Sequence, residues 1–95
     1  MKIFCLLVTE THKGEIFSPR IPIVSNDVKK AEAALKEFAD ATKNEFKKEF
    51  ENGDWVIEAD EAGWFEAYKR DNYSENQVLA LIFDKNLEEL DWSDG

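Results

Sequence analysis

The chain has 95 residues, which is enough for one domain and too few for two independent hydrophobic cores. Apolar residues make up 43% and aromatic residues 13%, so the composition supports a buried core and excludes intrinsic disorder. The formal net charge of −9 excludes a protein that binds nucleic acid by neutralising phosphates, because that requires the opposite sign. We therefore expect a single domain over residues 1–95.

The start of the chain and its one cysteine indicate a soluble, cytoplasmic protein. The apolar run after Lys2 has six residues, whereas a secretory signal needs about 7–15 apolar residues and a cleavage site. No segment approaches the roughly 20 apolar residues that span a bilayer. Cys5 has no partner for an internal disulfide and lies within an apolar run, which indicates a buried, inert thiol.

The first two elements are expected to be strands. Residues 2–10 are apolar on both alternating faces, which is typical of a central strand or of a strand whose outer face is covered. After a turn at residues 11–14, residues 15–24 form a second extended segment. Pro19 and Pro22 lack the amide proton that a central strand donates, so this segment is expected at a sheet edge.

A long helix is expected over residues 28–51. Ser25, Asn26 and Asp27 offer N-cap side chains, and Gly53 suits the left-handed position after the last turn. At about 100° per residue, one side of this helix collects a continuous apolar stripe. The stripe consists of Val28, Ala31, Leu35, Phe38, Ala39, Thr42, Phe46 and Phe50.

Residues 55–60 and 64–69 are expected to form a β-hairpin. Gly63 ends the connection, which predicts a three-residue loop with this glycine in the left-handed conformation. That register places three cross-strand pairs on one face: Asp60 with Trp64, Glu58 with Glu66, and Val56 with Tyr68. The opposite face packs on the helix and consists of Trp55, Ile57, Ala59, Phe65 and Ala67.

Residues 77–84 are expected to form the last strand, because the apolar run inside them is short. A helix over residues 75–83 is the alternative, since residues 74–77 match a capping box. Residues 86–95 form an acidic C-terminal tail. The order β-β-α-β-β-β predicts an α+β fold, a two-layer sandwich in which one long helix crosses one face of an antiparallel sheet of four or five strands.

Charge is distributed unevenly along the chain. Residues 1–48 contain 9 bases and 7 acids, whereas residues 49–95 contain 3 bases and 14 acids. Such asymmetry can steer a basic partner toward the acidic half of the molecule. Solubility alone is the other explanation for an acidic surface.

Residue types and spacings argue against catalysis, a metal site or a cofactor. Glu58 and Glu66, expected opposite each other, could divide acid and base roles, but an open sheet face supplies no cleft. Cys5 and His12 lie on different elements and complete no zinc ligand set, and no calcium-loop pattern occurs. We expect no enzyme, no cofactor and no bound metal.

The candidate interaction site is the face of the hairpin that the helix leaves bare. Large aromatic rings among carboxylates favour a protein interface with a basic partner. The expected site residues are Glu58, Asp60, Trp64, Glu66 and Tyr68. In size and acidity the chain resembles small inhibitors from phages and mobile elements, some of which imitate DNA. That resemblance implies a nucleic-acid-binding protein as the partner.

Two other occupants of this face are compatible with the sequence. The C-terminal tail could fold over it, or a homodimer could bury it, in which case the acids serve only solubility. A weak carboxylate-based enzyme is the third functional interpretation. Direct contact with nucleic acid or with a membrane is not expected.

Overall fold

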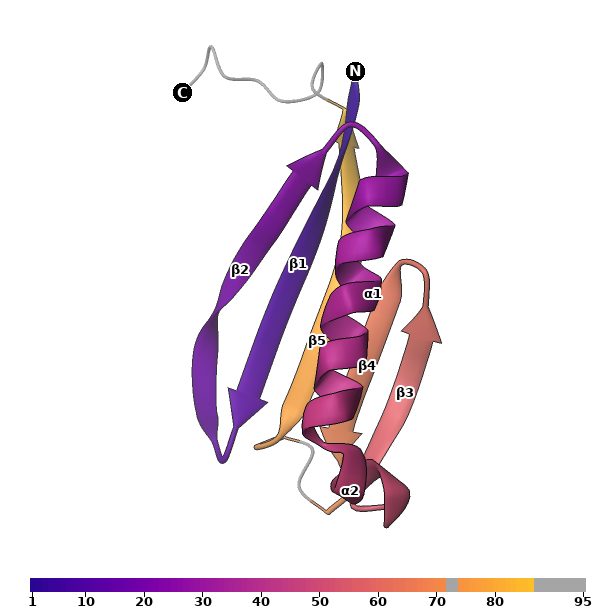
Figure 1. Cartoon of the computed structure of the whole chain (residues 1–95). Helices are drawn as coiled ribbons and strands as arrows, with labels where there is room; N and C mark the ends of the chain where they lie inside the picture. The colour runs from indigo at the N-terminus through magenta and orange to yellow at the C-terminus, as the bar shows by residue number, and fades with distance from the viewer. Residues whose placement is uncertain (72–73, 87–95) are drawn as a thin grey trace.

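The computed structural model describes residues 1–71 and 74–86 (Figure 1). Over these residues the chain forms five strands and two helices. In chain order they are β1 (Lys2–His12), β2 (Glu15–Ser25), α1 (Val28–Glu45), α2 (Lys47–Glu51), β3 (Trp55–Glu61), β4 (Trp64–Lys69) and β5 (Gln77–Asn86). Asn86 ends β5, and the rest of the expected acidic tail lies outside the described residues.

The strands form one antiparallel sheet in the order β2-β1-β5-β4-β3. The last strand of the sequence, β5, lies at the centre between β1 and β4, so the strand prediction for this segment is confirmed. Helix α1 runs along one face of the sheet and packs mainly on β1, β5 and β2 (Figure 1). The predicted α+β two-layer fold is therefore confirmed. We call the face under α1 the inner face and the opposite one the outer face.

Strand β2 lies at the edge of the sheet, as its two prolines predict. Its pairing with β1 is irregular between Leu6 and Val8 and again between Val8 and Glu10. Each irregularity adds one residue to β2, and the two extra segments contain Pro22 and Pro19. Bulges and prolines make this edge a poor template for the addition of another strand.

Strand β1 extends to His12, beyond its predicted end. Lys13 and Gly14 alone form the turn, with φ values of 53° and 81°, as a two-residue hairpin loop requires. The ring of His12 meets Phe17 edge-on at 5.5 Å and stacks near Phe46 at 6.1 Å between centroids. His12 is therefore a packed residue at the end of β1, whereas the sequence predicted it within the turn at residues 11–14.

The long helix begins where it was predicted and divides near its end. Asp27 is the N-cap, and its Oδ1 accepts a hydrogen bond from the backbone N–H of Lys29 at 3.0 Å. At Phe46 the backbone leaves the helical conformation, with φ −107° and ψ 30°. The ring of Phe46 stacks on Trp55 at 4.5 Å between centroids. The prediction of one continuous helix over residues 28–51 was wrong. The helix is interrupted at Phe46, and this interruption allows the Phe46 ring to pack on Trp55 of the sheet.

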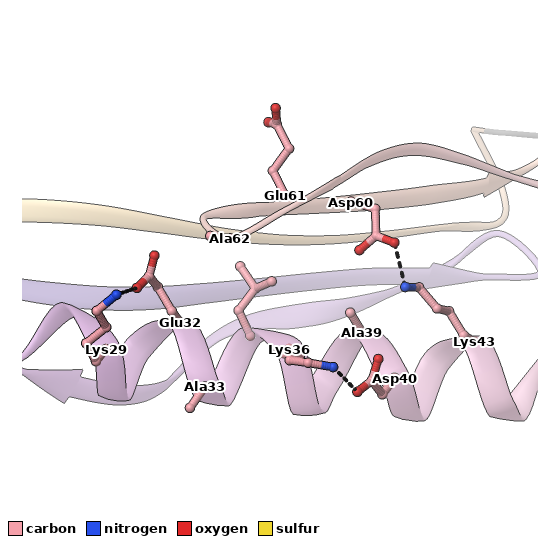
Figure 2. A pocket seen from close by; sticks show the side chains of 11 residues that line it. Lys29, Glu32, Ala33, Lys36, Ala39, Asp40, Lys43, Asp60, Glu61 and Ala62 are labelled. Carbon is pink, nitrogen blue, oxygen red and sulfur yellow. Dashed lines mark hydrogen bonds and ion pairs between the residues drawn. The ribbon is translucent and has the colours of Figure 1, made fainter.

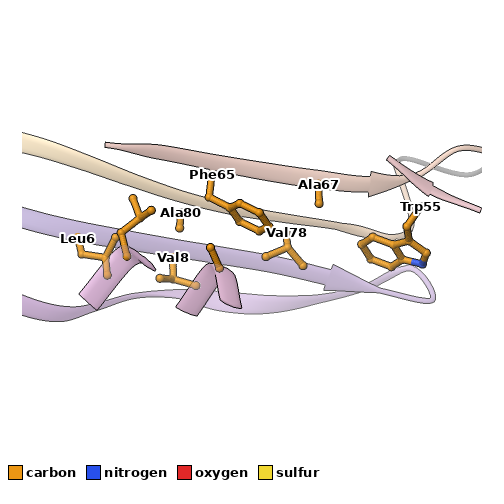
Figure 3. Close-up of a cluster of buried hydrophobic side chains, with 9 residues drawn as sticks. Leu6, Val8, Trp55, Phe65, Ala67, Val78 and Ala80 are labelled. Atoms are coloured by element: carbon orange, nitrogen blue, oxygen red, sulfur yellow. The ribbon is translucent and has the colours of Figure 1, made fainter. Parts of the chain in front are cut away.

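The hydrophobic core fills the space between α1 and the inner face (Figure 3). Phe65 is fully buried and meets Phe38 of α1 edge-on at 6.5 Å between ring centroids. Trp55, Phe65 and Ala67 are on the inner face, as predicted. The buried cluster consists of Leu6, Val8, Leu35, Ala39, Trp55, Phe65, Ala67, Val78 and Ala80.

The β3–β4 hairpin follows the predicted register only in the half away from its turn. Val56 pairs with Tyr68, as expected. Nearer the turn, Trp64 pairs with Glu61 and not with Asp60. The connection between the strands therefore has two residues, and the three-residue loop was a wrong prediction.

A bulge at Glu58 supplies the residue that the prediction had placed in the turn. Glu58 is extra in β3, between the pair made by Ile57 and the pair of Ala59 with Glu66. A slip of one residue moves every following side chain to the other face. Ala59 is consequently opposite Glu66 and not on the helix side, and Glu58 and Glu66 are not a direct cross-strand pair. Gly63 does not adopt the left-handed conformation.

Candidate functional site

The centre of the outer face is apolar. Alternation along β1 and β5 places three cross-strand pairs on this face: Cys5 with Phe83, Leu7 with Leu81, and Thr9 with Leu79. No helix of the described segments covers them, and Leu81 is 37% exposed. An exposed apolar centre of this kind is typical of interaction surfaces.

Cys5 is buried, although no helix of the described residues covers its side of the sheet. It lies between its cross-strand partners, Val24 on β2 and Phe83 on β5, and is 6% exposed. A shielded thiol among apolar neighbours packs as a small apolar residue. The expected burial of Cys5 is thus confirmed.

The acidic part of the outer face is formed by β4 and β3. Trp64, Glu66 and Tyr68 alternate along β4 and therefore share a face, with Glu58 and Glu61 beside them on β3. Four of the five expected site residues are thus brought together. Glu58, Trp64, Glu66 and Tyr68 line a shallow pocket of about 380 Å³ together with Gln77 of β5.

Hydrogen bonds join each aromatic ring of this pocket to a carboxylate. The indole Nε1–H of Trp64 donates to Glu66 Oε1 at 3.1 Å. The hydroxyl of Tyr68 donates to Glu58 Oε2 over a longer distance of 3.5 Å. Trp64 remains 39% exposed, so its ring is accessible to a binding partner.

The fifth expected site residue, Asp60, is on the inner face. It pairs with the buried Phe65, and Lys43 Nζ of α1 donates to Asp60 Oδ2 at 2.5 Å. Figure 2 shows Asp60 directed toward α1 and Glu61 directed away from it. The predicted outer position of Asp60 was wrong because the bulge shifts the register, and Glu61 takes its place opposite Trp64.

Ion pairing distinguishes the two faces. Five acids on α1 or the inner face have a basic partner: Glu10 with Arg20, Glu32 with Lys29, Asp40 with Lys36, Asp60 with Lys43, and Asp84 with Lys2. On the outer face, no lysine or arginine of residues 1–71 and 74–86 makes an ion pair with Glu58, Glu61 or Glu66. The outer face therefore carries negative charge that the described chain does not compensate.

A larger groove of about 540 Å³ runs between α1 and the turn of the β3–β4 hairpin (Figure 2). It exists because α1 lies mainly over β1, β5 and β2, which also leaves Ile57 of β3 38% exposed. Leu35 and Ala39, each only 2% exposed, line its apolar floor. Its lysines are already paired with acids of the groove: Lys29 with Glu32, Lys36 with Asp40, and Lys43 with Asp60. This internal compensation leaves the groove with less uncompensated charge than the outer face.

The chain matches no protein-family model, no curated protein and no solved structure. Within residues 1–71 and 74–86, no helix has the length and apolar character needed to cross a membrane. The same residues contain no group of three or more His, Cys, Asp or Glu side chains that could hold a metal ion. Function is therefore inferred from the surfaces of the chain itself.

The sequence shows residues 2–10 to be apolar on both faces, but the predicted site residues did not include the apolar centre of the outer face. Both central strands are apolar at successive positions, whereas a strand with one solvated face alternates between apolar and polar residues. One helix can cover only one side of a sheet. The apolar residues missed in this way are Leu7, Leu79, Leu81 and Phe83.

Proposed function

We propose that this protein is a small, non-enzymatic interaction protein whose outer face binds a basic surface of another protein. The proposal depends on the charge of Glu58, Glu61 and Glu66, which form no ion pair with a lysine or arginine of the described residues and lie beside an exposed apolar centre. Protein interfaces combine an apolar centre with a polar rim. Charge complementarity at the rim selects the partner and accelerates the encounter.

The outer face is large enough for a specific complex. Five strands about 4.8 Å apart, averaging roughly nine residues at about 3.3 Å per residue, give a face of roughly 700 Å². Each partner in a standard protein complex contributes about 800 Å². Both edges of the sheet are irregular, because β2 contains two prolines and β3 contains a bulge. A partner is therefore expected to bind the outer face and not to add a strand at an edge.

Nucleic-acid-binding proteins are the partner class that fits this chemistry. They need lysine and arginine to neutralise phosphates, so they present the basic surfaces that an acidic face would select. The outer face would occupy the DNA or RNA site of such a partner. Competition between this protein and nucleic acid is therefore expected.

A capture experiment with matched variants tests the proposal. The immobilised chain is exposed to a lysate of the organism that encodes it, beside the triple variant Glu58→Gln, Glu61→Gln and Glu66→Gln. The control triple removes the same charge from exposed acids on the helices: Glu37→Gln, Glu45→Gln and Glu51→Gln. We expect a basic protein to be captured by the native chain and by the control but to be lost with the outer-face triple. Added nucleic acid and higher salt should both weaken capture.

Equal capture by both triples, or capture that nucleic acid and salt leave unchanged, would contradict the proposal. A second copy of the chain is the alternative occupant, which the uncharged centre around Leu81 favours. Sedimentation equilibrium distinguishes this case. A dimer that persists at high salt and dissociates when Leu81→Glu is introduced would show that the outer face binds a second copy and not a basic partner.

A further inference from the structure

We infer that the outer-face pocket lined by Glu58, Trp64, Glu66, Tyr68 and Gln77 is an arginine-binding site. It would receive an arginine side chain of the basic partner, so the inference rests on the proposed function and specifies its recognition chemistry. The pocket volume of about 380 Å³ is within the range of small-ligand sites in proteins.

The spacing along β4 gives the pocket an elongated shape. Trp64 and Tyr68 are four residues apart on one strand, which separates their Cα atoms by about 13 Å. Glu66 lies between them, and Glu58 lies on the neighbouring strand. A compact cation would reach only one ring, whereas an extended side chain with an apolar stem and a charged end can contact both.

Arginine suits these walls better than lysine does. Its guanidinium is planar, so it can stack on an aromatic ring and donate two parallel hydrogen bonds to a carboxylate. The ammonium of lysine is a strongly hydrated point charge without that geometry. The pocket offers both surfaces at once, a ring and a carboxylate, at each of its ends.

The chain fills two comparable sites on its other face with its own cations. Arg20 donates to Glu10 at 2.6 Å, and its guanidinium carbon lies 6.0 Å from the ring centroid of Phe38. Lys43 pairs with Asp60, and its Nζ lies 5.8 Å from the ring centroid of Phe65. In the outer pocket the carboxylates and rings are present, but no lysine or arginine of the described residues pairs with the acids. A partner's arginine would complete the same arrangement.

An NMR titration tests the pocket without the partner. The probe is acetyl-Gly-Arg-Gly-amide, compared with the same peptide carrying lysine or citrulline, which is neutral and similar in shape to arginine. The readouts are the indole N–H of Trp64 and the side-chain amide of Gln77. The indole of Trp55, 6% exposed and on the inner face, is the internal reference.

We expect the arginine peptide to shift the Trp64 and Gln77 resonances to saturation while that of Trp55 stays in place. The lysine peptide should bind about threefold more weakly and the citrulline peptide about tenfold more weakly. The double variant Glu58→Gln/Glu66→Gln should weaken arginine binding about tenfold. The control double variant, Glu37→Gln/Glu45→Gln, should bind as the native chain does.

Equal binding of arginine and citrulline, or no saturable shift of Trp64, would overturn the inference. The capture experiment shows whether the arginine site alone is wrong or the proposed function is wrong. If capture still depends on the outer-face acids while the arginine peptide does not bind, the basic partner is retained and the arginine site is wrong. If the peptide binds with the expected preference and no basic protein is captured, the arginine site is retained and the proposed function is wrong.

Discussion

Glu10 is a half-buried carboxylate on the inner face whose charge is stabilised by two neighbours. Its side chain is 22% exposed, and it accepts hydrogen bonds from Arg20 Nη2 at 2.6 Å and from His12 Nε2 at 3.1 Å. Burial raises the pKa of Glu10, but the hydrogen bonds from Arg20 and His12 together outweigh it. The pKa of Glu10 therefore lies below its ordinary value.

The lowered pKa of Glu10 makes stability depend on acid pH. The carboxylate contributes stability above the unfolded-state pKa of about 4.5, and this contribution is lost as the pH falls through the lower folded-state pKa. We expect Glu10→Gln to lower the free energy of unfolding by about 1 kcal/mol at pH 7, with the difference shrinking toward pH 3. Urea unfolding across this pH range measures it.

The exposed Glu15, on the same hairpin, provides the control, because Glu15→Gln removes the same charge. It should leave the free energy of unfolding nearly unchanged. A loss in Glu10→Gln that is equally large at pH 3 and pH 7 would show that the ion pair with Arg20 is not its cause.

At the scale of single elements, two glycines with the same predicted role have different backbone conformations. Gly53, after α2, has a φ of 84°, in the left-handed region that was predicted for it. Gly63, in the β3–β4 turn, lies outside that region. Neither has an atom within 4 Å of the position that an added Cβ would take. The effect of a side chain at either site is therefore set by the backbone alone.

Substituting each glycine by alanine should affect the free energy of unfolding differently in the two turns. We expect Gly53→Ala to lower the free energy of unfolding by about 1 kcal/mol, because an L-residue is strained in the left-handed region. Gly63→Ala should change it by less than about 0.5 kcal/mol. Thermal and urea unfolding of both variants measure the difference. Equal losses would indicate that the hairpin has the three-residue loop with a left-handed glycine after all.

At the scale of the whole molecule, the excess of negative charge opposes compact folding through repulsion between the acids. The net charge is −9, and residues 49–95 contain 14 of the 21 acids. The outer-face acids in this half have no ion pair among the residues described, so they repel one another. The exposed ion pairs of α1 offset little of this, since such pairs contribute about 0–1 kcal/mol each.

Salt should therefore stabilise the folded chain. Raising NaCl from about 20 mM to 300 mM screens the repulsion, and we expect the free energy of unfolding to rise by on the order of 1 kcal/mol. The increase should be smaller in the Glu58→Gln, Glu61→Gln, Glu66→Gln triple than in the control triple on the helices. A decrease with salt would mean that the ion pairs outweigh the repulsion.

The sequence predicted most of the elements because their signals are local. The prolines of β2 predicted its place at the sheet edge, Asp27 predicted the start of α1, and the apolar run before Asp84 predicted a strand. The face assignment of Phe65 and Trp64 also followed from alternation, because both lie on β4, where no bulge occurs. These features depend on neighbours within a few residues, which the sequence contains explicitly.

Only the tertiary structure decided the details that depend on distant partners. Asp60 can face either side of the hairpin with a slip of one residue, and Lys43, 17 positions earlier on α1, pairs with it on the inner side. The helix is interrupted at Phe46, because the ring of this residue stacks between Trp55 and His12 of the sheet. Local periodicity defines the two faces of each element, but the contacts between elements determine the register in which those faces meet.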